Sequence, residues 1–279
     1  MKVITPQQNF PSKNTSYPRV IVPTMGALHD GHLALIRRAR ELAGASGEVV
    51  VTIFVNPTQF NNPNDLDNYP KTLSADLDLC RLNGADLVYT PDNHSMYHPD
   101  HSVSVIEKSL STRLCGATRP GHFEGVCTVV LKFFNITAAD IGVFGKKDFQ
   151  QLAIIQRMVR DLQLPIQIEG VETVREPSGL ALSSRNTRLS KEQHLDAPRI
   201  RNALLETQKL YRSGEKITKK LLAITCNVIE ASSEGAKIDY LELLNATTLQ
   251  PVERVDEPAI IAAAVFYGEV RLIDNIELS

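Results

Sequence analysis

The stretch from Val20 to Arg40 constrains the fold of this chain more than any other. Its first residues, Val20-Ile21-Val22, are apolar and β-branched, which is typical of a buried parallel strand. A short turn containing Gly26 follows, and the residues from Leu33 to Arg40 then carry apolar side chains at helical spacing. A buried strand, a small-residue turn and a helix predict one unit of an α/β fold. The N–H groups at the helix start then form an anion site at the sheet edge.

Two histidines stand at the start of this helix. His29 and His32 are three residues apart, so they share one helix face, and two imidazoles there can donate to phosphoryl oxygens as charge develops. The spacing therefore predicts a triphosphate site. Two other interpretations are a solvated helix start that the histidines merely cap, and a zinc pair. The zinc pair lacks an HExxH pattern and has no cysteines or carboxylates at ligand spacing.

The sequence around these histidines resembles known families. His29-Asp30-Gly31-His32 resembles the H-x-G-H signature of the nucleotidyltransferase superfamily, which includes class I aminoacyl-tRNA synthetases. The longer string PTMGALHDGH is similar to that of the pantothenate synthetase (pantoate–β-alanine ligase) family. The resemblance implies that ATP binds this whole turn, namely Met25, Gly26, Ala27, Leu28, His29, Asp30, Gly31 and His32.

Length and composition set the broad class. A chain of 279 residues favours two domains. We expect a Rossmann-like parallel sheet in residues 1–175, which binds ATP and pantoate, and a smaller α+β lid domain in residues 176–279. The net charge of −2 argues against nucleic acid as a ligand, and no apolar run is long enough to span a membrane. Four scattered cysteines and the absence of a secretory signal favour the cytoplasm.

Local patterns elsewhere in the chain predict further elements. Met1 to Pro18 is polar and rich in proline, which indicates a loop or short arm, and Asn61–Tyr69 has the composition of a loop. The pattern predicts strands at Glu48–Phe54 and in three C-terminal runs, and amphipathic helices over Lys191–Arg212 and Ile217–Ser232.

Gln59 and Asp76 follow the second predicted strand. An amide such as Gln59 can hold both a hydroxyl and a carboxylate of a small hydroxy acid, although a plain turn glutamine fits equally well. The string FVNPTQF resembles the family's pantoate-binding string, which implies that Gln59 contacts pantoate and later β-alanine. Asp76 matches an acidic position that the family associates with Mg²⁺. A solvated aspartate in the first turns of a helix is the alternative.

A second strand-to-helix turn carries the string GKKDFQQ. Lys147 can reach phosphate as a point charge, Asp148 can accept from a ribose hydroxyl, and Gln151 supplies a second amide for the hydroxy acid. A solvated, charged helix start is the alternative. The family usually reads G-E-K-D here, so Lys146 departs from its pattern. The resemblance assigns the turn to ATP binding, through Gly145, Lys146, Lys147 and Asp148.

A third string, ALSSRN, follows Val174 and the strand before it. Hydroxyls and a guanidinium suit a triphosphate, since arginine binds phosphate with two parallel hydrogen bonds. The string resembles the family's A-M-S-S-R-N, the counterpart of the synthetases' KMSKS loop, with leucine in place of methionine. A serine-rich surface turn is the alternative. The predicted ATP contacts here are Val174, Leu182, Ser183, Ser184 and Arg185.

Taken together, the strings imply a ligase that uses ATP, Mg²⁺, pantoate and β-alanine, and we also expect a homodimer. Pantoate would attack the α-phosphorus of ATP to give pantoyl adenylate, and the amine of β-alanine would then displace AMP. The residues expected to carry catalysis are His29, His32, Lys147 and Arg185. Two alternatives are a nucleotidylyltransferase that moves AMP onto a phosphate, and a nucleotide sensor without catalytic activity.

Overall fold

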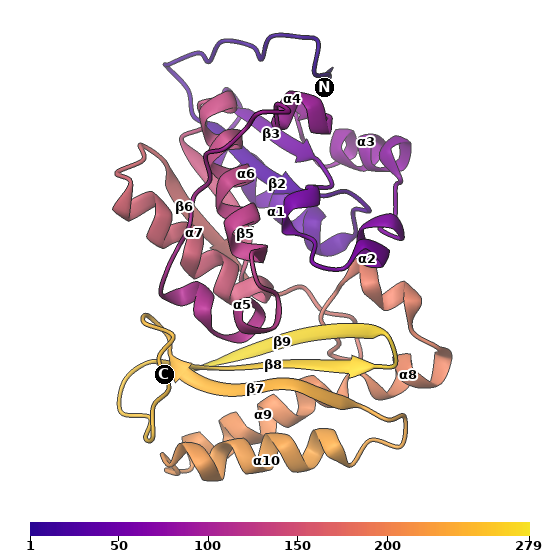
Figure 1. Ribbon diagram of the computed structural model, residues 1–279, viewed down its shortest axis with the longest axis vertical. Coiled ribbons are helices and arrows are strands. Elements are labelled where there is room, and N and C mark those ends of the chain that lie inside the picture. The colour runs from indigo at the N-terminus through magenta and orange to yellow at the C-terminus, as the bar shows by residue number, and fades with distance from the viewer. The chain divides into compact units, whose positions relative to one another are not determined.

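A computed structural model describes residues 1–279 and divides the chain into two compact units (Figure 1). The first unit comprises Met1–Lys146 and Gln150–Glu172, and the second comprises Lys147–Phe149 and Thr173–Ser279. The boundary expected between residues 175 and 176 lies a few residues later than this division. The inclusion of Lys147–Phe149 in the second unit was not predicted.

The first unit is built on a six-stranded sheet with the order β1-β4-β3-β2-β5-β6, and every pair in it is parallel. Apolar, β-branched residues fill its central strands, as expected for strands that helices cover on both faces. The chain order reverses between β2 and β5, which is where open α/β sheets bind ligands. The strands are β1 (Lys2–Ile4), β2 (Arg19–Thr24), β3 (Glu48–Ile53), β4 (Leu87–Tyr89), β5 (Ile141–Gly145) and β6 (Gln167–Val171).

Helices cover both faces of this sheet. On one face α1 and α3 place Leu33, Ile36 and Cys80 in a core with the valines of β2 and β3. On the other face Phe133 of α6 meets Phe54 edge to face, and Leu152 of α7 lies over Gly170. The helices are α1 (Asp30–Ala43), α2 (Pro63–Asp67), α3 (Leu73–Leu82), α4 (Asn93–Met96), α5 (Leu114–Thr118), α6 (His122–Thr137) and α7 (Phe149–Asp161). None of the helices is both long enough and apolar enough to cross a bilayer.

Two predictions for the first unit were wrong in detail. The N-terminal arm contains a strand, because β1 extends the sheet by pairing with β4. The segment expected to be a loop before α3 contains the short helix α2, which Asn62 caps through its side chain and Pro63 begins. Both elements are very short, and apolar periodicity gives little signal over so few residues.

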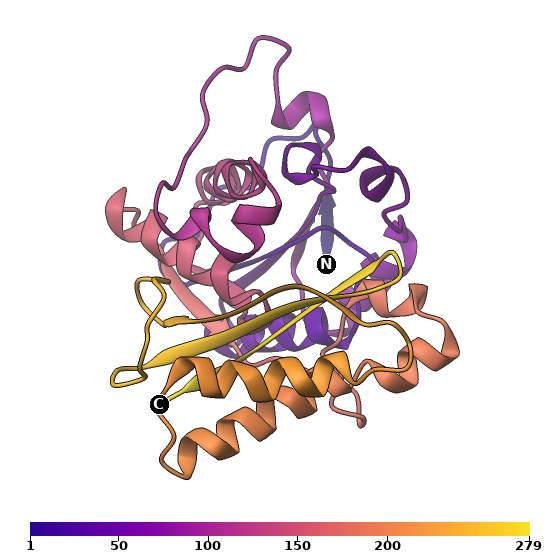
Figure 2. The ribbon, with the colours of Figure 1, turned by 60° about the horizontal axis from the view of Figure 1, so that its bottom comes forward.

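The second unit carries a three-stranded antiparallel sheet with the order β7-β8-β9 (Figure 2). Helices α9 and α10 lie side by side against one face of it, and their apolar residues form its core. The single helix expected from Lys191 is interrupted before Arg199, because Pro198 precedes α9. The bounds are α8 (Lys191–Asp196), α9 (Arg199–Arg212), α10 (Thr218–Glu230), β7 (Lys237–Asn245), β8 (Ala259–Tyr267) and β9 (Val270–Leu278). The predicted α/β fold with a smaller α+β domain is confirmed.

Candidate active site

The turn after β2 has a strained backbone. Gly26 has φ of 89° and Ala27 has φ of 50°, both in the left-handed region. A side chain at Gly26 would place its Cβ 3.0 Å from Asp76 Oδ2 and 3.1 Å from Ile53 Cγ2, so only glycine fits there. For Ala27 the left-handed conformation costs about 1–2 kcal/mol. Strain of this kind persists only where surrounding groups hold the backbone in place.

Asp76 is the group that holds this turn. Its side chain is buried, Oδ1 accepts from the backbone N–H of Leu28 at 2.8 Å, and Oδ2 accepts from Ala27 N–H at 3.0 Å. The hydroxyl of Thr72 donates to the same Oδ2 at 3.1 Å. Both carboxylate oxygens of Asp76 are therefore engaged by the protein itself. The structure thus shows that Asp76 fixes the turn, and its expected contact with Mg²⁺ stays a prediction.

His29 and His32 lie together at the start of α1, with their rings tilted by 43°. Their ring centroids lie 4.1 Å apart, and His29 is the N-cap residue of the helix. The backbone N–H of Gly31 donates to His29 Nδ1 at 3.2 Å, and the backbone N–H of His29 donates to His32 Nδ1 at 3.3 Å. Because each Nδ1 is an acceptor, the neutral rings carry their protons on Nε2. The histidines cap the helix and also present N–H donors. A helix cap and a phosphate site are therefore compatible interpretations of this pair.

Gln59 lies close to the same turn. It ends the short 3₁₀ helix η1 (Pro57–Gln59), and its side-chain amide donates to Met25 Sδ at 3.3 Å. Its Oε1 accepts from Asn56 Nδ2 at 3.0 Å. Asn56 is itself buried, and its Oδ1 accepts from the hydroxyls of Thr58 and Tyr97. The side-chain amide of Gln59, which is predicted to bind pantoate, is thus oriented by Asn56 and, through Asn56, by Tyr97. The sequence alone assigned no role to either residue.

Helix α6 supports Gln59 from its backbone side. The backbone carbonyl of Gln59 accepts from Arg119 Nη2 at 3.1 Å and from His122 Nδ1 at 2.8 Å. Gly125 of α6 packs so closely on η1 that an added Cβ would lie 2.7 Å from the Thr58 carbonyl and 2.8 Å from Gln59 N. Arg119 and His122 therefore hold Gln59 through its main chain. The string RPGHFEGV thus serves as the support of η1.

Replacing Gly125 by alanine is expected to displace η1. The overpacking should lower the free energy of unfolding by about 1–3 kcal/mol and raise the KM for pantoate more than the KM for ATP. Asn135→Ala, at an exposed position of the same helix, is the matched control. Denaturant titration and steady-state kinetics check both expectations, and an unchanged KM for pantoate would contradict the role of Gly125.

The residues of the second predicted turn, GKKDFQQ, are divided between the two units. In the first unit Gln151 is half-buried and forms no side-chain hydrogen bond, while the neighbouring Gln150 is buried and bonds the backbone of Leu110 and Cys115. Lys146 forms an ion pair with Glu172, so part of its charge is already neutralised. Gly145 ends β5, and nothing lies within contact distance of an added Cβ there.

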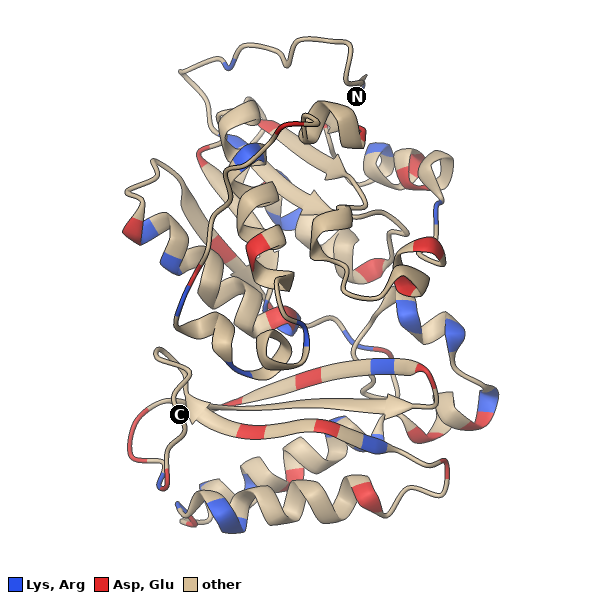
Figure 3. Cartoon of the chain, in the orientation of Figure 1, with Lys and Arg blue, Asp and Glu red and all other residues tan.

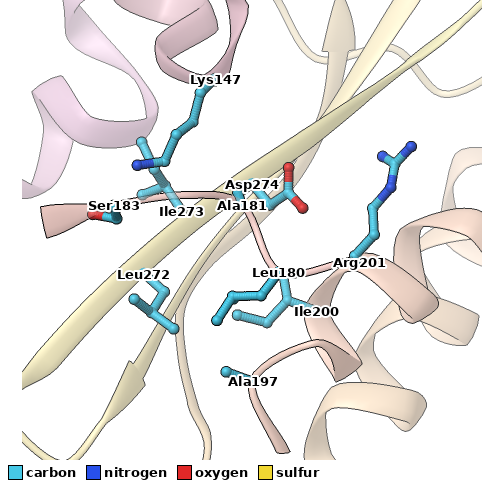
Figure 4. A pocket seen from close by; sticks show the side chains of 10 residues that line it. All are labelled: Lys147, Leu180, Ala181, Ser183, Ala197, Ile200, Arg201, Leu272, Ile273 and Asp274. Carbon is cyan, nitrogen blue, oxygen red and sulfur yellow. The ribbon is translucent and has the colours of Figure 1, made fainter. Parts of the chain in front are cut away.

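Lys147 belongs to the second unit and lines a small pocket there with Ser183 and Asp274 (Figure 4). Figure 4 shows its amine on the Ser183 side of the pocket. Burial lowers the pKa of the Lys147 amine, and the charge of Asp148 opposes this change. Arg185 lowers the pKa further and Asp274 raises it. Asp148 is exposed at the end of the 3₁₀ helix η3 (Lys146–Asp148).

The predicted Ser/Arg loop forms the 3₁₀ helix η4 (Ser184–Arg188). Ser183 is its N-cap, and its hydroxyl accepts from the backbone N–H of Arg185 at 3.3 Å. Leu182 N–H donates to the carbonyl of Val174 at 3.0 Å, which fixes the entry to the loop. Basic residues gather on this segment and at the start of α8, as Figure 3 shows in blue. The loop thus combines hydroxyl, N–H and guanidinium donors, which suit phosphate.

The family model of pantoate–β-alanine ligase matches residues 5–277 of this sequence. The chain belongs to the pantoate–β-alanine ligase family. It is 52% identical over 259 residues to a pantothenate synthetase of Akkermansia muciniphila, a match that covers 93% of this chain and 92% of the relative. The crystal structure of pantothenate synthetase from Thermus thermophilus matches with a TM-score of 0.92 and 38% identity, over 100% of this chain and 99% of that one.

A second solved member of the family carries ligands. It is the pantoate–β-alanine ligase of Francisella tularensis, described as complexed with βγ-ATP and β-alanine, and it matches at 34% identity with a TM-score of 0.77. The match covers 95% of this chain and 91% of that one. The resemblance inferred from PTMGALHDGH and the other strings is therefore confirmed at the level of the family.

Proposed function

We propose that this ligase condenses pantoate with β-alanine and uses ATP through a pantoyl-adenylate intermediate. The observation that carries the proposal is the pair of neighbouring imidazoles at the N-terminus of α1, with ring centroids 4.1 Å apart, on a turn that also contacts Gln59. A helix N-terminus with two N–H donors suits phosphate, and an amide beside it suits a small hydroxy acid. One turn therefore serves both substrates of the first step.

The first half-reaction needs positioning and neutralisation of charge more than it needs a general base. The carboxylate of pantoate, with a reference pKa of about 4, is already ionised at neutral pH and attacks the α-phosphorus of ATP. The bond to the β-phosphate breaks and pyrophosphate leaves. We assign His32, with His29, to donate to phosphoryl oxygens as charge moves onto them. We also assign Lys147, Ser183, Ser184 and Arg185 as donors to phosphate oxygens.

In the second half-reaction the amine of β-alanine attacks the acyl carbon of the adenylate. The ammonium group first loses a proton to solvent; the amide bond then forms, the acyl–phosphate bond breaks, AMP leaves with the electron pair, and the nitrogen releases a second proton. We assign Gln59 and Gln151 to hold the pantoyl group through both steps. The neighbours of Gln59 keep its amide in one orientation, which favours the same geometry in each step.

Mg²⁺ is proposed to accompany ATP, bound mainly by the phosphates and water, as is common for nucleotides. Asp76 is the side chain predicted to contact the ion, and its two oxygens also accept hydrogen bonds from the turn. When bound, the ion supplies positive charge to the phosphates.

Isotope exchange and product analysis test the proposed function together. Labelled pyrophosphate should enter ATP only when pantoate is present, and β-alanine should not be needed. With all three substrates, AMP, pyrophosphate and pantothenate should form in equal amounts. A nucleotidylyltransferase would give no free AMP, and a nucleotide sensor would bind ATP without exchange. Either result would overturn the proposal.

We also propose that the enzyme works in the cytoplasm as a homodimer. Cys80, Cys115 and Cys127 are buried free thiols, which is usual in a reducing compartment. Val103 and Ile106 are exposed on a segment without regular structure, and Val103 retains 82% of its accessible surface. Burial of this segment between two copies would remove that apolar surface from water. Sedimentation of the wild type and of a Val103→Lys variant tests the dimer, and a monomeric wild type would exclude it.

A further inference from the structure

Strand β9 contains a charged residue where its pattern calls for an apolar one. Val270, Leu272, Ile276 and Leu278 alternate along β9 and are buried in the core of the second unit. Asp274 occupies the same alternating face and is only 5% exposed. Burying a carboxylate costs several kcal/mol unless it is paired and hydrogen-bonded, and replacing such a pair by apolar residues is often neutral or stabilising. Stability alone therefore does not account for this residue.

Asp274 is paired with Arg175, and the geometry is bidentate. Arg175 Nη1 donates to Asp274 Oδ2 at 2.7 Å, and Nη2 donates to Oδ1 at 2.9 Å. Arg175 also bonds the carbonyl of Gly179 at 3.1 Å. It forms an antiparallel bridge with Ala181, immediately before the Ser/Arg loop. Asp274 thus fixes the segment that leads into Ser183.

The next residue of β9 holds Lys147 directly. The side-chain amide of Asn275 donates to the backbone carbonyl of Lys147 at 2.9 Å. Asp274 and Lys147 line the same pocket together with Ser183 and Arg201 (Figure 4). Two adjacent residues of one strand therefore reach both predicted phosphate-binding segments of the second unit.

Charges of both signs surround Lys147. Burial lowers the pKa of its amine, and Arg185 of η4 and Arg175 lower it further. Asp148 of its own turn and Asp274 of β9 raise that pKa. Arg201 of α9 lines the same pocket; burial lowers the pKa of its guanidinium, and the charge of Asp274 opposes this change. Asp274 is thus the buried anion among four cations.

We propose that Asp274 and Asn275 are positioning residues for ATP activation, which hold Lys147 and the Ser/Arg loop in place. The inference rests on the function proposed for Lys147. Asn275 acts on the main chain of Lys147, and Asp274 acts through its charge and through Arg175. Neither residue needs to touch a substrate.

The test is pyrophosphate exchange measured from about pH 7 to about pH 10. Asp274→Asn should lower kcat/KM for ATP about tenfold or more, as misplaced phosphate donors do. It removes a charge that raises the pKa of Lys147, so the lysine loses its proton at lower pH and the alkaline decline should begin earlier. Asp274→Glu keeps the charge and should keep the wild-type decline. Asn275→Ala removes no charge, so it should lower kcat/KM by a similar factor without moving the decline.

Asp239→Asn is the matched control, because Asp239 of β7 pairs with Arg271 at 2.7 Å in the same unit but lies outside this pocket. It should leave both the rate and the pH profile unchanged.

A wild-type rate and pH profile for Asp274→Asn would overturn the inference. If that variant does not fold, wild-type kinetics of Asn275→Ala overturn it instead. Lys147→Ala distinguishes the proposed function of Lys147 from the positioning role of its neighbours. Wild-type exchange in Lys147→Ala would reject the function proposed for Lys147. Loss of exchange in Lys147→Ala, together with wild-type exchange in the Asp274 and Asn275 variants, would reject only the positioning role.

Discussion

Replacing His32 by alanine is expected to lower pantoate-dependent pyrophosphate exchange at least about a hundredfold, which is the scale of losing one preorganised donor to a developing negative charge. The loss should fall on kcat more than on the KM for ATP, because the donor acts most strongly in the transition state. His32 also takes part in the capping box of α1, so the variant should lose about 0.5–2 kcal/mol of stability.

A thermal unfolding measurement beside the exchange assay separates the two effects, because a lost cap lowers Tm without a large change in the rate of the folded enzyme. His98→Ala is the control, since His98 is exposed on a segment without regular structure. Exchange at the wild-type rate in the His32 variant would remove this imidazole from the mechanism.

Asp76→Asn is expected to have the second largest effect. The substituted amide can no longer accept from both Ala27 and Leu28, and loss of charged hydrogen bonds in the core should cost about 2–3 kcal/mol of stability. The turn before the histidines would lose the hydrogen bonds that hold Gly26 and Ala27 in the left-handed conformation. Exchange should then fall about a hundredfold through misplacement of the imidazoles.

The dependence on Mg²⁺ decides between a positioning residue and a metal ligand. With Asp76 holding the turn, the Mg²⁺ concentration for half-maximal exchange should stay at the wild-type value while kcat falls. A large rise in the Mg²⁺ concentration for half-maximal exchange would instead indicate that Asp76 binds the metal ion. Asp78→Asn is the matched control, because Asp78 lies on the same helix and forms only an exposed ion pair with Arg81. It should change neither property.

The fold was largely predictable because its main elements carry strong local patterns. The β-branched runs of β2 and β3 and the apolar stripe of α1 each point to one structure, and the strands of the second unit alternate clearly. The close approach of the two imidazoles at the start of α1 follows from their spacing. Strand β1 was missed because it gains its stability only from pairing with β4.

The residues that support the site could not be predicted in the same way. Asp76 contacts Ala27 and Leu28 across about fifty positions of sequence, and no local pattern specifies such a partner. Gly125 is needed for its close approach to Thr58, which depends on tertiary packing. One signal was present, however: Asp274 interrupts an apolar alternation, and a buried charge in such a row indicates a specific partner.

The division of the chain has a practical consequence for work with fragments. Lys147–Phe149 belongs to the second unit although the residues on either side belong to the first. A fragment that starts at Thr173 would therefore omit the peptide whose carbonyl Asn275 binds, and a fragment that ends at Glu172 would carry that peptide without the strand that binds it. Each fragment would lack one partner of this hydrogen bond. We therefore expect the two fragments to fold only when they are expressed together in the same cell.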